Sequence, residues 1–122
     1  MNNYTASDND CHIRLALDSI ANKWTVLIAG ALMHDTKRFG ELRKDIEGIS
    51  QKMLTQTLRG MERDGLVNRK IYATIPPKVE YSLTITGISL ITILLDLQYW
   101  SKTNADHILA SRELYDARLK EV

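Results

Sequence analysis

The sequence predicts a mainly α-helical chain with one small β-hairpin. Over most of the chain, apolar residues recur at intervals of three and four, which is the period of an amphipathic helix. Residues 66–83 instead hold two short stretches typical of strands, with the loop Thr74-Ile75-Pro76-Pro77 between them. At 122 residues the chain has the size of one domain, and we expect a single domain over residues 1–122.

The first two helices are predicted from apolar spacing. A helix is expected to begin at Cys11, where Asn9 or Asp10 can serve as its N-cap. Its apolar residues at helical spacing are Ile13, Ala16, Leu17 and Ile20. The next segment, WTVLIAGALM at residues 24–33, is a mostly apolar run whose length favours a buried helix.

The middle of the chain predicts two further helices before the hairpin. Residues 38–40 are expected to form a very short strand, and residues 41–46 a short helix. A longer helix follows over residues 50–63, with Ser50 as its N-cap. Gly65 lies where a left-handed residue commonly ends a helix.

The helix over residues 50–63 is expected to have two different faces. At 100° per residue, one arc holds Met53, Leu54, Thr57, Leu58 and Met61, and the other holds Lys52, Thr55, Gln56, Arg59 and Arg63. Ordinary exposed helices carry pairs of Glu and Lys, whereas the second arc carries cations, an amide and a hydroxyl. Such groups bind phosphates and base edges. The alternative is a surface helix with an accidental excess of cations.

The charge of the chain is unevenly distributed. Residues 37–78 contain ten Lys and Arg against five Asp and Glu, although the net charge of the whole chain is only +1. A basic middle with acidic flanks fits a surface that binds a polyanion, because neutralising phosphates requires clustered cations. A solvated charged surface is the alternative interpretation.

After the hairpin, Thr84 or Thr86 can cap a helix that continues to about Trp100, and a second helix is expected over residues 105–119. The first of these carries apolar residues at too many angles to face one small core. We therefore expect part of it to pack against a second copy of the chain, through Ile91, Leu94, Leu95, Tyr99 and Trp100. The alternative is a central helix buried within a monomer.

Several functional classes are disfavoured. The longest apolar run, residues 88–100, is interrupted by polar residues, so no membrane span is expected. The beginning, MNNYTASDND, lacks the features of a secretory signal, and one cysteine cannot form an internal disulfide; both predict a cytoplasmic protein. The three histidines lie in different segments and no phosphate-binding glycine loop is present. We therefore expect no enzyme activity, no metal site and no cofactor.

The predicted order of elements is that of a winged helix-turn-helix. Three segments also resemble the hallmark blocks of the HxlR-type bacterial transcriptional regulators: ALDSIANKW (16–24), RFGELRKDIEGISQKMLTQTLRGMERDGLVNRKIY (38–72) and PPKVEYSLTITG (76–87). The resemblance implies a homodimer that binds a palindromic operator in double-stranded DNA. Residues 11–83 would form the DNA-binding core, and residues 84–122 with the N-terminal helix would form the dimer interface.

The resemblance also implies the DNA contacts. The helix over residues 50–63 would be the recognition helix, and the hairpin around Pro76, Pro77 and Lys78 would be the wing. The DNA-binding residues would be Arg38, Ser50, Gln51, Lys52, Thr55, Gln56, Arg59 and Lys78. Of these, Lys52, Gln56 and Arg59 are expected to reach base edges. Ser50 and Gln51 are expected to hold a phosphate at the start of the helix, and Arg38 and Lys78 to clamp phosphates. Arg43 and Arg69 are expected to be solvated charges.

Cys11 is the candidate sensor residue. Members of the HxlR-type family commonly have a cysteine at this place, and several respond through it to quinones, aldehydes or oxidants. The resemblance implies repression that is relieved by an electrophile or oxidant. The predicted helix N-terminus and His12 would favour the reactive thiolate, whereas Asp8 and Asp10 would oppose it. With one cysteine per chain, the reaction would be alkylation, a mixed disulfide with a small thiol, or a bridge between two copies.

Three alternatives stay open. Cys11 can be a partly buried structural residue. The effector can be a noncovalent ligand in the region of Trp24, Tyr99 and Trp100, although aromatic residues at such positions more often belong to a core. Finally, the winged helix can be a module that binds protein and not DNA, which the basic outer face of the helix disfavours.

Overall fold

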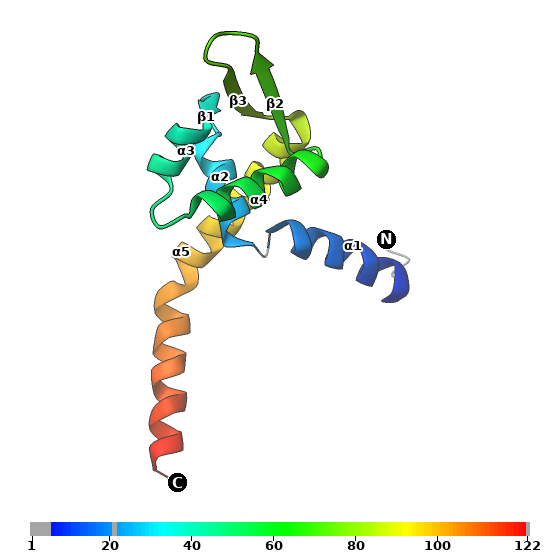
Figure 1. Ribbon diagram of the computed structural model, residues 1–122. Coiled ribbons are helices and arrows are strands. Elements are labelled where there is room, and N and C mark those ends of the chain that lie inside the picture. The colour runs from blue at the N-terminus through cyan, green and yellow to red at the C-terminus, as the bar shows by residue number, and fades with distance from the viewer. Residues whose placement is uncertain (1–5, 21, 122) are drawn as a thin grey trace. The chain divides into compact units, whose positions relative to one another are not determined.

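A computed structural model describes residues 6–20 and 22–121 of the chain. Its elements in chain order are α1 (Ala6–Ile20), α2 (Lys23–Ala31), β1 (Lys37–Arg38), α3 (Phe39–Asp45), α4 (Gln51–Arg63), β2 (Val67–Tyr72), β3 (Lys78–Leu83) and α5 (Ile85–Lys120) (Figure 1). Contacts divide the chain into two compact units, Met1–Ile91 and Thr92–Val122. The predicted class, mainly α with a small β-hairpin, is confirmed.

The sheet is antiparallel, with the strand order β1-β3-β2. Its long pair is the predicted hairpin, in which Val67 lies opposite Leu83 and Tyr72 opposite Lys78. The short first strand covers only Lys37–Arg38, one residue earlier than predicted. Phe39 already belongs to α3, because the backbone N–H of Arg38 donates to Glu41 Oε1 at 3.0 Å and so begins the helix there.

The core of the first unit lies where α2, α3 and α4 meet. Its fully buried side chains are Ile28 of α2, Leu42 of α3, and Leu54 and Leu58 of α4. The base of the hairpin adds Val67, which is also buried. The second and third helices of the helix-turn-helix are therefore held by the same apolar contacts that orient α4.

The predicted ends of α4 are confirmed. Ser50 precedes the helix, and its Oγ accepts the backbone N–H of Met53 at 3.0 Å. Gly65 follows the helix with φ of 74°, a left-handed conformation that glycine adopts without a steric penalty. These two residues limit α4 to its thirteen residues.

Helix α1 begins at least five residues before the predicted start at Cys11. The segment from residue 6 to residue 10 contains no Gly or Pro to stop the helix. In addition, Arg14 Nε lies 3.1 Å from Asp10 Oδ1, an i,i+4 ion pair that joins successive turns. Cys11 consequently lies inside the helix and not at its N-terminus, so the predicted effect of a helix N-terminus on this thiol was wrong.

The predicted N-cap of the last helix is confirmed. Thr84 precedes α5, and its Oγ1 accepts the backbone N–H of Gly87 at 3.0 Å. The same hydroxyl donates to the carbonyl oxygen of Gly65, and the backbone N–H of Thr84 donates to the carbonyl of Leu66 at 3.0 Å. The start of α5 is therefore fastened to the turn that follows α4.

The C-terminal region is one helix of 36 residues, α5, and not the two helices predicted. No Gly or Pro separates the predicted segments. Between them, Thr103 Oγ1 donates to the carbonyl of Tyr99 at 2.8 Å, and Asn104 Nδ2 donates to the carbonyl of Trp100 at 2.9 Å. The polar side chains that marked a boundary in the sequence thus bond to the preceding turn and leave the helix unbroken.

Candidate nucleic-acid interface

Helix α4 presents a polar face to solvent. Its exposed side chains include Gln51, Lys52, Gln56, Arg59 and Arg63, and Thr55 is half-buried beside them. The opposite face is buried through Leu54, Thr57, Leu58 and Met61. The division of this helix into two faces, predicted from its spacing, is therefore confirmed, and the candidate base-contacting residues share one surface.

The start of α4 is suited to an anion. No acidic residue lies in its first turn, so the partial positive charge of the helix N-terminus is not neutralised locally. Ser50 Oγ accepts from Met53, which leaves its hydroxyl proton available to a phosphate. Thr55 instead uses its hydroxyl proton on the carbonyl of Gln51 at 2.9 Å, so toward DNA it can act only as an acceptor.

A pocket of about 270 Å³ separates α4 from the sheet. It is lined by Phe39, Thr55, Leu58, Arg59, Glu62, Arg69 and Tyr81. Across it, Arg69 Nε of β2 lies 3.3 Å from Glu62 Oε1 of α4. The interpretation of Arg69 as a solvated charge was therefore wrong, because the hairpin register brings it beside the last turn of α4. Burial raises the pKa of Tyr81, and the positive charge of Arg69 partly offsets this.

The candidate wing residue Lys78 is already paired. Its Nζ lies 2.8 Å from Glu80 Oε1 and 5.1 Å from the centre of the Tyr72 ring. Tyr72 also donates its hydroxyl to Glu80 Oε2 at 3.1 Å. The hydrogen bond from Lys78, with the second from Tyr72, lowers the pKa of the Glu80 carboxyl. The carboxylate is therefore charged at neutral pH. Glu80 was missed by sequence reasoning, which treated it only as one polar residue in an alternating strand.

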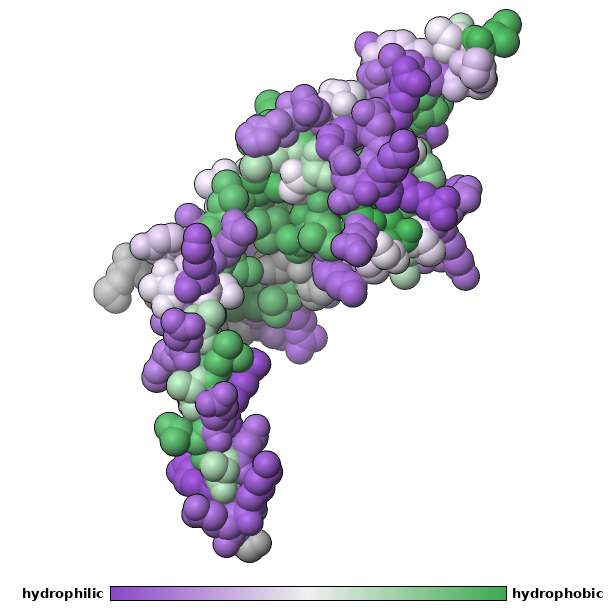
Figure 2. All heavy atoms as spheres, turned by 90° about the vertical axis from the view of Figure 1, so that its left-hand side faces the viewer, coloured by the Kyte–Doolittle hydropathy of each residue, from purple (hydrophilic) through white to green (hydrophobic). Residues whose placement is uncertain are grey.

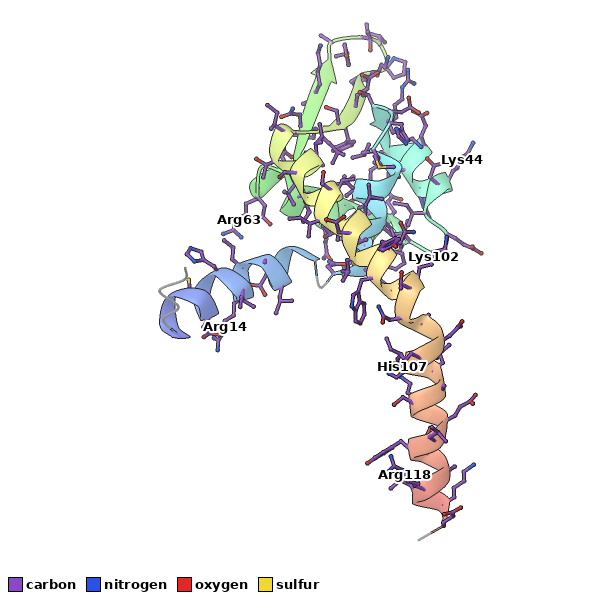
Figure 3. The ribbon with its side chains drawn as sticks, turned by 180° about the vertical axis from the view of Figure 1, so that it is seen from behind. Arg14, Lys44, Arg63, Lys102, His107 and Arg118 are labelled. Atoms are coloured by element: carbon purple, nitrogen blue, oxygen red, sulfur yellow. The ribbon has the colours of Figure 1, made fainter. Side chains whose placement is uncertain are left out.

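The other candidate phosphate contact, Arg38, lies at the junction of β1 and α3 and is exposed. Its neighbour Lys37 forms an ion pair with Asp45 at the end of α3. That hydrogen bond raises the pKa of Lys37. Lys44, on the same helix, projects away from the ribbon (Figure 3). Of these cations on β1 and α3, Lys37 is committed to a carboxylate, whereas Arg38 is accessible to a ligand.

The predicted dimer residues fall into two groups. Ile91 is 7% exposed and belongs to the core of the first unit. In the second unit Leu94 is half-buried, whereas Leu95, Tyr99 and Trp100 are exposed, Tyr99 to 74%. Other apolar side chains remain exposed farther along α5, among them Leu109, Tyr115 and Leu119 (Figure 2). This helix thus has apolar surface that the described chain does not cover.

The remaining candidates occupy separate places. Cys11 is exposed on α1. Within residues 6–20 and 22–121, no group of His, Cys, Asp and Glu side chains is arranged to hold a metal ion. His107 lies on α5 (Figure 3) and His34 follows α2, so these two histidines belong to different units. Among the helices described, none is long and apolar enough to cross a membrane.

The helix-turn-helix, its exposed basic helix and the hairpin agree with one known sequence pattern. The pattern of the HxlR-like helix-turn-helix family matches residues 19–109, which is most of the chain. The chain belongs to the HxlR-like helix-turn-helix family. Cys11 lies outside the part of the chain that matches the HxlR-like pattern.

Relatives of this HxlR-like chain are regulators. YtfH of Escherichia coli strain K12, named as a helix-turn-helix transcriptional regulator, is 42% identical over 103 residues, covering 84% of this chain and 82% of YtfH. A structure from Enterococcus faecalis V583, described as a MarR-family regulator, has 40% identity and a TM-score of 0.76, covering 89% of this chain and 99% of that one. The oxidised form of the redox regulator HypR has 41% identity and a TM-score of 0.70, covering 77% and 97%.

These comparisons confirm the winged helix-turn-helix with a long C-terminal helix. The protein is a helix-turn-helix transcriptional regulator and not an enzyme. Membership of the HxlR-like family implies DNA as its partner.

Proposed function

We propose that the protein is a cytoplasmic, homodimeric repressor that binds a palindromic operator. The observation that carries this proposal is the exposed face of α4, where Lys52, Gln56 and Arg59 stand together on a helix fixed by buried leucines. A helix with this surface fits the major groove, where arginine pairs with guanine and glutamine with adenine. Residues 11–83 then form the DNA-binding core.

The other DNA contacts position the protein on the backbone. Ser50 and Gln51 hold a phosphate at the N-terminus of α4, because free backbone N–H groups and the helix dipole both favour an anion there. Thr55 accepts a hydrogen bond beside them, and Arg38 binds a phosphate from the edge of the sheet. Lys78, which is predicted to clamp a phosphate, reaches DNA only if it leaves Glu80.

Replacing Arg59 with alanine is expected to weaken operator binding by about 2 kcal/mol, or roughly thirtyfold, because one arginine-to-base contact is worth about that much. Fluorescence anisotropy with the upstream intergenic DNA of the protein's own gene measures this loss. Arg112→Ala, a change at an exposed arginine of α5, serves as the matched control and should bind like the wild type. Equal affinities for the Arg59 and Arg112 variants would contradict the assignment of α4.

The dimer is assigned to the unit Thr92–Val122 together with the N-terminal helix. Leu94, Leu95, Tyr99 and Trp100 would be covered by the partner, which removes exposed apolar surface from water. Ile91 contributes little because it is already buried. A twofold dimer would place two α4 helices about 34 Å apart, so that half-sites are separated by one turn of DNA.

We further propose that an electrophile or oxidant relieves repression by reacting with Cys11. The thiol is exposed, as such a reaction requires, and the chain is similar to a protein named as a redox regulator. Because the sequence contains only one cysteine, the product is an alkylated thiol, a mixed disulfide or a bridge between two chains.

Treatment with a quinone is expected to lower the operator affinity of the wild-type protein at least about tenfold, a typical size for allosteric coupling. Cys11→Ser, which keeps the size of the side chain but removes the thiol, should retain full affinity under the same treatment. Anisotropy measures both proteins, and mass spectrometry reports the adduct. If the quinone modifies Cys11 without changing the affinity, the thiol is not the sensor.

A further inference from the structure

The two faces of the sheet differ in what they contact. One face is turned toward the helices, because Arg69 of β2 pairs with Glu62 of α4 and Lys37 of β1 pairs with Asp45 of α3. Side chains alternate between the faces of a strand, so the neighbouring positions are turned away from the helices. These positions form the outer face of the sheet: Arg38, Lys70, Tyr72, Lys78 and Glu80.

One carboxylate lies among the cations of this outer face. Glu80 is opposite Arg38 on one side and opposite Lys70 on the other. Its two oxygens are nevertheless used by Lys78, at 2.8 Å, and by the Tyr72 hydroxyl, at 3.1 Å. Within residues 6–20 and 22–121, Lys70 forms no ion pair; its Nζ lies 4.9 Å from the Tyr72 ring, and its side chain is exposed.

We propose that Glu80 determines how strongly the wing, defined as β2, β3 and their loop, attracts DNA: it holds Lys78 in an ion pair and leaves Lys70 as the working phosphate contact. This inference rests on the proposed DNA-binding function. A phosphate that approaches Lys78 must displace a carboxylate already bonded to it, whereas a phosphate that approaches Lys70 displaces only water and counterions. Phosphate contacts carry no sequence information, so restraining one of them lowers the affinity for all DNA and preserves discrimination by α4.

The test compares two lysines that differ only in their partners. Lys70→Gln is expected to weaken binding roughly threefold to tenfold and to make the salt dependence shallower by about 0.9 in log–log slope, the value for one phosphate. Lys78→Gln should change the affinity less than about twofold, because its charge is already neutralised. Both changes leave Glu80 in place, so this comparison does not depend on whether a Glu80 variant folds.

The Glu80 variant then reverses the pattern. Glu80→Gln should tighten binding by roughly threefold to tenfold and steepen the slope by about 0.9, on a scrambled duplex as much as on the upstream intergenic duplex. In this background Lys78→Gln should remove the gain, which gives a nonzero coupling in a double-mutant cycle. Glu113→Gln, at an exposed carboxylate of α5, controls for the loss of one negative charge.

Anisotropy titrations between about 50 and 200 mM salt measure all of these variants on both duplexes, and circular dichroism verifies their folding. A Lys78→Gln variant that weakens binding as much as Lys70→Gln, or lysine and glutamate effects that simply add, would overturn the role of Glu80 and leave the DNA-binding function intact. Failure of the wild type to bind either duplex would instead overturn the proposed function, and the inference with it.

Discussion

Gly87→Ala is expected to destabilise the protein by about 3 kcal/mol, the upper end of the cost of overpacking. A Cβ at this position would lie 2.2 Å from the carbonyl oxygen of Leu66 and 3.0 Å from a methyl group of Leu83. The nearer obstacle is backbone, and the same carbonyl accepts the N–H of Thr84 at 3.0 Å. It cannot move away without breaking the bond that fastens α5 to the turn after α4.

The matched control is Gly60→Ala in the middle of α4. A Cβ there meets nothing within 4 Å, so helix propensity alone acts and the change should stabilise the protein by up to about 1 kcal/mol. Thermal unfolding followed by circular dichroism, at one protein concentration, should therefore shift the two melting temperatures in opposite directions. Equal shifts would show that the start of α5 does not approach Leu66 as closely as the structure has it.

Leu54→Ala should lower the free energy of unfolding by about 2–5 kcal/mol, the range for truncating a buried leucine. Leu54 is 0% exposed, at the centre of the face that α4 turns toward the core. Truncation removes its contacts and leaves a cavity that the neighbouring helices fill only in part. Because the same contacts orient α4, DNA binding should weaken as well, in proportion to the fraction of unfolded protein.

Urea unfolding measures this loss. Ile75→Ala is the control, since the Ile75 side chain is fully exposed in the loop between β2 and β3 and its removal should change the stability by less than about 0.5 kcal/mol. If Leu54→Ala unfolds at the same urea concentration as the wild type, α4 is not anchored through this residue and the proposed recognition surface loses its support.

Local signals determined where α4 begins, where it ends and which of its faces is buried. The bond from Met53 to Ser50 spans three residues, and the left-handed Gly65 follows from the conformational freedom of one residue. Thr84 as the N-cap of α5 is a signal of the same kind. The family resemblance added the assignment of α4 to DNA.

Two local predictions failed because other local bonds were stronger. The expected start of α1 at Cys11 relied on one cap, but no residue before it stops a helix and Arg14 pairs with Asp10 across one turn. The expected break in α5 relied on polar residues, yet Thr103 and Asn104 bond to carbonyls four residues earlier. Polar side chains mark the end of a helix only where they cannot be satisfied by the helix itself.

By itself, then, the sequence determined the order of the elements, the two faces of α4 and the residues that cap α4 and α5. Only the tertiary structure decided which charges are free to meet DNA. Tyr72 and Glu80 are eight residues apart, and Glu62 and Arg69 belong to different elements, so their contacts depend on the strand register and on the packing of the sheet against α4. Periodicity describes one element at a time, whereas an ion pair between elements exists only after they have packed together.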